Sequence, residues 1–220
     1  MKKIIYPEIE LEGVKAVLID LDDTLYPYHT NNNRALRAAY AFARHELQIN
    51  FDSFVEEFER TFDARYEELG PVPSAHSRFF VFQQVLLNHG ISRAWTKAYE
   101  MEKIFWRHFM KRMSPDRGAR NFLRMCQKKK IPVCLVTDLF ADIQIKKLQK
   151  LRLTQYIDML VSNDDVGVDK PHKSLFERAL KRLQLKPEEV IMVGDNPQKD
   201  IAGAEALGIR TYQVFPPKKK

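Results

Sequence analysis

The chain has 220 residues, of which 45% are hydrophobic and 30% charged, and it carries a formal net charge of +7 at pH 7. This length allows a sizeable core, and the composition is that of a soluble globular protein. No run of 18 apolar residues occurs, and Pro7, Glu8 and Glu10 interrupt the N-terminal segment before a signal-peptide core could form, so we expect a cytoplasmic protein with no membrane partner.

Five short apolar segments predict the strands of a parallel sheet. They are continuous rather than alternating, which is typical of strands covered by helices on both faces. Segments with helical periodicity separate the last four, and repeated strand–helix–strand units indicate a doubly wound α/β fold with a Rossmann-like sheet of five parallel strands. The predicted strands span 15–20, 131–136, 158–162, 189–193 and 210–214, and the helices between the last four span 142–151, 171–183 and 199–207.

The interval after the first strand has a different character, because it contains four consecutive helical patterns and no good strand. Phe51, Phe54 and Phe58, for example, follow the i, i+3, i+7 spacing of one helix face. We therefore predict an inserted all-helical subdomain at 29–113, and an α/β core made from residues 1–28 and 114–220.

Polar side chains follow the predicted strands at the edge where open parallel sheets bind their ligands. Each one alone could simply cap a helix or a turn. Several carboxylates at one edge would repel one another unless a cation offsets them, so the set points to a site. The residues are Asp20, Asp22, Asp23 and Thr24 after the first strand, Thr137 and Asp138 after the second, Asp195 and Asp200 after the fourth, and Lys170 ahead of the helix at 171–183.

Magnesium suits such a site, because it prefers oxygen ligands and is commonly bound by one or two carboxylates with substrate phosphate. No Cys or His accompanies these aspartates at ligand spacing, which argues against zinc. A carboxylate can attack phosphorus to form an aspartyl-phosphate, and a second carboxylic acid can protonate the departing alkoxide and then activate water. Asp20 followed by Asp22 provides that pair.

These residues after the predicted strands resemble the motifs of the haloacid dehalogenase-like superfamily, whose phosphatases carry four motifs in a fixed order. One such motif is weak evidence, whereas four in order, each after the expected element, are specific. The resemblance covers nearly the whole chain and implies that the helical insert is a cap of the first type. The matching residues are Asp20-Leu21-Asp22-Asp23-Thr24, then Thr137, then Lys170, and finally Gly194, Asp195 and Asp200.

The resemblance implies a role for each carboxylate. Asp20 would be the nucleophile and a magnesium ligand, and Asp22 the general acid/base and a ligand through its backbone carbonyl. Asp195 would complete the metal site, and Asp200 would support Lys170 or the waters of the metal.

The remaining motif residues would hold the phosphoryl group of the substrate. Thr137 would donate a hydrogen bond to it, and Lys170 would neutralise its charge. Asp138 occupies a position where the family often has Asn; we expect a backbone contact to phosphate there, with the side chain turned away.

Several activities share these motifs. The presence of Asp22 argues against a dehalogenase, and the absence of any lysine between Lys15 and Lys97 argues against a phosphonatase with a cap lysine. The prediction is a magnesium-dependent phosphatase acting on a small phosphorylated metabolite, such as a nucleoside monophosphate or a sugar phosphate. A phosphomutase of the same superfamily and a non-catalytic interaction module with the same fold are the alternatives.

The positive charge gives no support for a nucleic-acid partner. It is spread over stretches at 127–130, 146–152 and 216–220, without zinc-finger spacing or alternating Arg and aromatic residues. Attraction of a small anionic substrate explains the charge at least as well.

Overall fold

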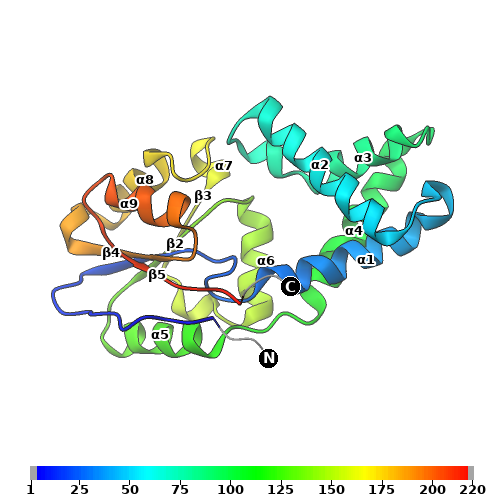
Figure 1. The fold of residues 1–220 in the computed structure, drawn as a ribbon. Coiled ribbons are helices and arrows are strands. Elements are labelled where there is room, and N and C mark those ends of the chain that lie inside the picture. The colour runs from blue at the N-terminus through cyan, green and yellow to red at the C-terminus, as the bar shows by residue number, and fades with distance from the viewer. Residues whose placement is uncertain (1–3, 218–220) are drawn as a thin grey trace. The chain divides into compact units, whose positions relative to one another are not determined.

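The computed structural model describes residues 4–217. The chain forms two compact units (Figure 1): one comprises the segments up to Tyr28 and from Met113 onward, and the other is His29–Arg112. We call them the α/β unit and the helical unit. The second boundary between them lies one residue earlier than the sequence predicts.

The α/β unit is built on a parallel sheet with the strand order β3-β2-β1-β4-β5. The central strand β1 is fully buried and pairs with β2 on one side and β4 on the other, so that Val17 lies opposite both Val133 and Ile191. The predicted five-stranded, doubly wound α/β fold is confirmed. The strands are β1 (Ala16–Ile19), β2 (Val133–Thr137), β3 (Met159–Ser162), β4 (Val190–Gly194) and β5 (Arg210–Gln213).

Helices cover both faces of this sheet, with α5 and α6 on one face and α8 and α9 on the other (Figure 1). Ala16 and Leu18 of β1 share a buried core with Leu175 and Phe176 of α8. The helical elements of the unit are α5 (Arg117–Lys128), α6 (Ala141–Leu151), η2 (Thr154–Tyr156), α7 (Asn163–Val166), α8 (Lys173–Leu183), η3 (Pro187–Glu189), η4 (Pro197–Ala202) and α9 (Gly203–Glu205).

Two of these elements differ from the sequence-based prediction. Helix α5 was not predicted, although its buried residues Ala119, Phe122, Leu123 and Cys126 follow helical spacing. The helix predicted at 199–207 is instead a π-helical turn, η4, followed by the short α9. A π-helical turn is a local departure that hydrophobic periodicity does not reveal, and such turns are frequent at functional sites.

The chain leaves the α/β unit and returns to it at neighbouring points. The backbone N–H of Asp116 donates to the carbonyl of Leu25 over 2.9 Å, and the carboxylate of Asp116 accepts the N–H of Ile4. The outgoing and returning segments are therefore joined by a hydrogen bond inside the α/β unit.

The helical unit has an aromatic core. The ring of Phe82 stacks on that of Phe54 at 6.5 Å between centroids and also contacts Phe58 and Phe105, at 5.2 and 6.0 Å. This agrees with the aromatic stripes in the sequence, which place bulky side chains on one face of each helix. The elements of the unit are α1 (Tyr28–Leu47), which begins at its edge, α2 (Phe51–Leu69), η1 (Pro73–His76), α3 (Arg78–Asn88) and α4 (Ala94–Lys111).

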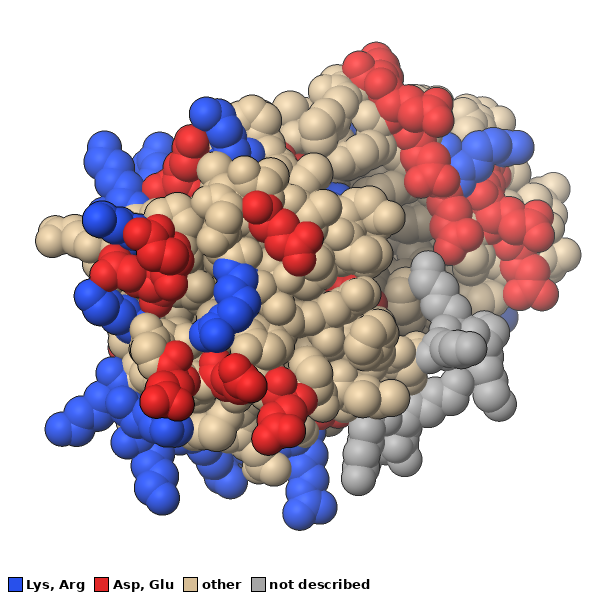
Figure 2. Space-filling model, turned by 60° about the vertical axis from the view of Figure 1, so that its left-hand side comes forward, with Lys and Arg blue, Asp and Glu red and all other residues tan. Residues whose placement is uncertain are grey.

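On the left of Figure 2, Lys and Arg are interspersed with Asp and Glu, whereas Asp and Glu gather at the upper right with few Lys or Arg beside them. Among the described residues, no helix is both long enough and apolar enough to cross a membrane.

Candidate active site

A pocket of about 160 Å³ opens at the carboxyl ends of the central strands of the α/β unit. Seven of the nine polar residues predicted from the sequence line this pocket, and Asp23 and Thr24 do not. The lining residues are Asp20, Asp22, Thr137, Asp138, Lys170, Asp195, Asn196, Lys199 and Asp200.

A buried ion-pair cluster lies at the base of this pocket. The Nζ atom of Lys170 is 2.7 Å from a carboxylate oxygen of Asp20 and 2.7 Å from one of Asp200, and it donates a third hydrogen bond, of 3.1 Å, to the carbonyl of Val136. Burial alone would lower the pKa of Lys170, but the surrounding carboxylates, Asp20 first, raise it well above its usual value. Lys170 is thus a fixed positive charge.

The surroundings of Asp20 disfavour the ionised form of its carboxyl group. Burial raises its pKa well above the usual value, the charges of Asp200 and Asp195 raise it further, and the charge of Lys170 opposes them. A single lysine does not fully offset three carboxylates, so the ionised form of Asp20 requires more positive charge nearby.

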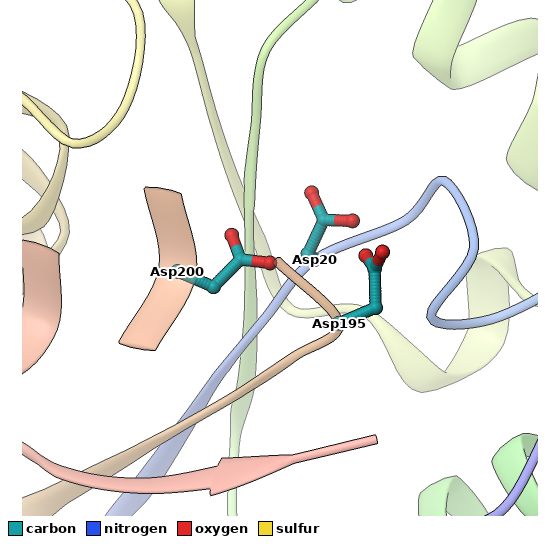
Figure 3. A group of neighbouring side chains, drawn as sticks. All are labelled: Asp20, Asp195 and Asp200. Carbon is teal, nitrogen blue, oxygen red and sulfur yellow. The ribbon is translucent and has the colours of Figure 1, made fainter. Parts of the chain in front are cut away.

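Asp195 lies on the other side of Asp20 (Figure 3). Ligand oxygens of Asp20, Asp195 and Asp200 lie within 4.8 Å of one another. Burial, followed by the charge of Asp200, raises the pKa of Asp195 to about 7, although Thr24 donates a 3.2 Å hydrogen bond to its carboxylate.

The backbone around η4 fixes the third carboxylate. The N–H of Asn196 donates to Asp200 over 3.0 Å. A Cβ atom on Gly194 would lie only 2.4 Å from a carboxylate oxygen of Asp200. Glycine is therefore required at 194, because the side chain of Asp200 occupies the space beside it.

The donor set suits a hard cation such as Mg²⁺. It contains carboxylate oxygens and, among the described residues, neither Cys nor His. One carboxylate oxygen of Asp20 accepts a hydrogen bond from Lys170, and one of Asp195 accepts a hydrogen bond from Thr24. The second oxygen of each aspartate can bind the cation. Asp200 has both oxygens engaged, by Lys170 and by the N–H of Asn196, so it is less suited to bind the cation directly.

Thr137 and Asp138 follow β2 along the pocket wall. The side-chain amide of Gln144 donates to the hydroxyl oxygen of Thr137 over 2.6 Å, which leaves the hydroxyl proton available to donate elsewhere. The carboxylate of Asp138 accepts the N–H of Lys170 at 2.8 Å and the Nζ of Lys199 at 3.0 Å. These contacts offset the charge that an aspartate introduces at this position.

Asp22 lies apart from the three clustered carboxylates. Both of its oxygens are 2.8 Å from the Nζ of Lys147, and it also accepts a hydrogen bond from the hydroxyl of Tyr26. The structure thus gives the two aspartates of the first motif different partners.

The comparisons with known proteins agree with this geometry. A model of the haloacid dehalogenase-like hydrolases matches residues 14–208. The chain belongs to this family. The sequence-based recognition is therefore confirmed, and with it the expectation of a hydrolase.

Its relatives within the haloacid dehalogenase-like hydrolases include phosphatases. Ribulose-1,5-bisphosphate 5-phosphatase of Halopiger xanaduensis is 34% identical over 203 residues, which are 91% of this chain and 84% of that protein. Glyceraldehyde 3-phosphate phosphatase of Methanopyrus kandleri is 31% identical over 91% of this chain and 84% of its own. The predicted enzyme class, a phosphatase of this family, agrees with both.

Solved structures support the fold of this family member. The 2-haloacid dehalogenase of Pseudomonas syringae pv. Tomato superposes with a TM-score of 0.72 over 90% of this chain and 85% of its own, at 22% identity. This likeness concerns the fold.

Five residues that contact the predicted site residues were not identified from the sequence: Tyr26, Gln144, Lys147, Asn196 and Lys199. In the sequence, Tyr26 looks like part of a turn. Gln144 and Lys147 did leave a signal, because they alternate with Leu148 and Leu151 at i, i+3, i+4, i+7 and therefore occupy buried positions of α6. Polar residues on the buried face of a helix indicate partners inside the protein.

Proposed function

We propose that this hydrolase is a magnesium-dependent phosphatase that cleaves a small phosphorylated metabolite through an aspartyl-phosphate. The observation that carries the proposal is the position of Asp20, which lines the pocket between the cation of Lys170 and the carboxylate of Asp195. The motif order in the sequence and the phosphatases among its relatives support the same reaction.

In this reaction Asp20 is the nucleophile. Lys170 holds one carboxylate oxygen of Asp20, so the second oxygen is oriented to attack phosphorus. The bond from phosphorus to the leaving oxygen breaks as the bond to Asp20 forms. Asp20 and Asp195 would hold Mg²⁺, with the backbone carbonyl of Asp22 as a further ligand. The bound cation supplies the positive charge that favours ionised carboxylates and offsets the charge of the phosphate.

Asp22 serves as general acid and then as general base. It passes a proton to the leaving oxygen, and afterwards it removes a proton from the water that attacks the aspartyl-phosphate. That attack breaks the bond between phosphorus and Asp20 and releases inorganic phosphate. A side chain at the pocket but outside the cluster of Asp20, Asp195 and Asp200 suits proton transfer better than metal binding.

The phosphoryl group is held by Thr137, Asp138 and Lys170. The hydroxyl of Thr137 accepts from Gln144 and can donate its own proton to a phosphoryl oxygen. Asp138 would contribute its backbone N–H, with its carboxylate turned to Lys199. Lys170 supplies positive charge beside the nucleophile, where negative charge accumulates. Asp200 acts through Lys170, to which it is paired.

Two of the relatives are named for sugar or triose phosphates, and we propose the same class of substrate here, in preference to nucleoside monophosphates. The site itself recognises the phosphoryl group and is compatible with this class.

The test is a panel of sugar phosphates, triose phosphates and nucleoside monophosphates, with released phosphate measured with Mg²⁺ and with EDTA. We expect Mg²⁺-dependent release, strongest for the sugar or triose phosphates, and its loss in Asp20→Asn. Asp142→Asn is the matched control, because Asp142 is an exposed carboxylate on α6 that pairs with Lys146. Turnover by Asp20→Asn or by metal-free enzyme would contradict the mechanism, and an isomerised product without phosphate release would indicate a mutase.

A further inference from the structure

Lys147 is a fully buried lysine behind the pocket. Its side chain has 0% exposure, whereas that of Asp22 has 26%. Its Nζ lies 2.8 Å from each carboxylate oxygen of Asp22. Lys147 therefore does not reach the pocket itself, but it contacts a side chain that does.

Aromatic side chains also lie beside this pair. The hydroxyl of Tyr26, itself fully buried, donates to Asp22. The Nζ of Lys147 lies 5.9 Å from the ring centroid of Tyr26 and 5.7 Å from that of Tyr28. The carboxylate of Asp22 is thus held at both oxygens by a cation and at one of them by a phenol, which restricts its rotation.

A need for stability does not explain a lysine at this position. Burying an ammonium group is costly, and an apolar side chain of similar volume often gives equal or greater stability. The other buried polar residue of α6, Gln144, also contacts a site residue, Thr137. The buried face of α6 thus places two polar groups against two residues of the proposed mechanism.

We propose that Lys147 is a positioning residue, which holds the carboxyl group of Asp22 at the pocket for proton transfer to the leaving oxygen and from the attacking water. This inference rests on the proposed function. When Asp22 gives its proton to the leaving oxygen, the negative charge that it acquires faces Lys147. The proton taken from water then restores the acid.

The test compares two aryl phosphates that differ in their need for an acid. Phenolate leaves poorly without protonation, whereas p-nitrophenolate leaves readily. We expect Lys147→Met to lower kcat/KM for phenyl phosphate at least about tenfold more than for p-nitrophenyl phosphate, a part of the 10²–10⁴ that general acid catalysis contributes. A merely structural residue would lower both values by the same factor.

A double-mutant cycle with Asp22→Asn provides a second readout. If Lys147 acts through Asp22, Lys147→Met has little further effect on kcat/KM for phenyl phosphate in the Asp22→Asn background. The matched control is Lys146→Met, because Lys146 is the neighbouring lysine of α6, with a side chain 56% exposed and paired with Asp142. We expect this control to leave the ratio of the two substrates unchanged.

Equal losses for the two substrates, no loss, or additive losses in the cycle would overturn the inference. If Lys147→Met does not fold, Tyr26→Phe removes one of the same contacts and keeps the ring, and it should shift the ratio in the same direction by a smaller factor. An unchanged ratio in Tyr26→Phe would then overturn the inference. Failure of the proposed function gives a different result, since the wild type would hydrolyse neither aryl phosphate or Asp20→Asn would keep its activity.

Discussion

The two units of this chain bury different kinds of side chain. Among the described residues, the charged groups buried in the α/β unit are Asp20, Asp116, Lys147, Asp169, Lys170 and Asp200, whereas in the helical unit only Arg78 is both charged and buried. The guanidinium of Arg78 lies over the ring of Phe62, 4.9 Å from its centroid, so even this charge is part of the aromatic packing.

The buried residues of the helical unit serve packing, whereas the buried charges of the α/β unit include those that line the pocket. The helical unit is stabilised by aromatic burial, a non-directional force that tolerates few charges. The α/β unit keeps like charges close together at the pocket, which opposes folding unless a cation offsets them. Proteins commonly retain such locally unfavourable arrangements at functional sites. Substitutions in the two units should therefore change different properties.

The largest effect is expected for Lys170→Met, which removes the cation between Asp20 and Asp200. We expect kcat/KM to fall by about 10²–10³, since a charge beside the transferring group is lost. The free energy of unfolding should fall by about 3–5 kcal/mol near pH 8, because two buried carboxylates lose their partner. Steady-state kinetics and urea unfolding measure the two quantities.

The control for that substitution is Lys173→Met, because Lys173 is an exposed lysine at the start of α8 that pairs with Glu177. Lys173→Met should change neither kcat/KM nor the free energy of unfolding appreciably. A loss of activity below tenfold in Lys170→Met would show that the buried charges of the α/β unit are structural.

Phe82→Ala tests the contribution of the aromatic core to the stability of the helical unit. Phe82 is fully buried among Phe54, Phe58 and Phe105, so the substitution should cost about 3–5 kcal/mol of stability through lost burial and a cavity. The only two tryptophans of the chain, at positions 95 and 106, lie in the helical unit, so their fluorescence during urea unfolding reports on this unit.

Phe80→Ala is the matched control, since the side chain of Phe80 is on the same helix but 45% exposed. It should cost no more than about 1 kcal/mol, in line with the smaller area that it buries. Equal losses for Phe80→Ala and Phe82→Ala would contradict an aromatic core centred on Phe82.

A smaller effect, specific to the α/β unit, is expected in the pH dependence of stability without metal. The pKa of Asp195 is raised to about 7 from its ordinary 3.8, so between these values the folded protein retains a proton that the unfolded chain has lost. Stability should therefore fall as pH rises from about 4 to 7, by on the order of 2 kcal/mol after allowance for solvent around this side chain.

Urea unfolding in EDTA measures how stability depends on pH between about 4 and 7. Asp195→Asn should reduce this dependence, and the control Asp142→Asn should leave it unchanged. Mg²⁺ should stabilise the wild type increasingly as pH rises, because the cation binds the ionised carboxylates, and Asp195→Asn should reduce that gain. A wild-type stability that rises with pH over the same interval would refute the proposed charge repulsion.

The smallest effect is expected for a surface pair of the helical unit. Lys103 lies 3.0 Å from Glu100, and both side chains are about half exposed. Lys103→Met should change stability by no more than about 0.5 kcal/mol and leave kcat/KM unchanged, because solvent screens exposed ion pairs. Thermal unfolding and the same phosphatase assay test this, and a larger loss of stability would show that the helical unit depends on charge as well as aromatic packing.

The sequence predicted the features that depend on strong, regular patterns. Continuous apolar segments identified the five strands, and the residues after them identified Asp20, Thr137, Asp195 and their neighbours, because parallel strands bring their carboxyl ends to one edge. The aromatic stripes likewise predicted the helices of the inserted unit.

The sequence was less informative where a residue serves another residue. The spacing of Lys147 with Leu148 and Leu151 indicates that it is buried, but nothing in the sequence of α6 identifies Asp22, far away along the chain, as its partner. Thr24 and Tyr26 contact Asp195 and Asp22 through the turn after β1, whose geometry periodicity does not specify. The π-helical turn that places Asp200 was missed for the same reason.

The insertion of the helical unit within the sheet also sets an order of events during synthesis. The central strand β1 leaves the ribosome before both of its neighbours, since β2 and β4 begin only at Val133 and Val190. The whole of His29–Arg112 is synthesised in between, and its helices are stabilised by contacts that are closer in sequence, which favours early folding. The fully apolar strand β1 therefore waits for its partners longer than any other strand of the sheet, and its unpaired edges remain exposed during that interval.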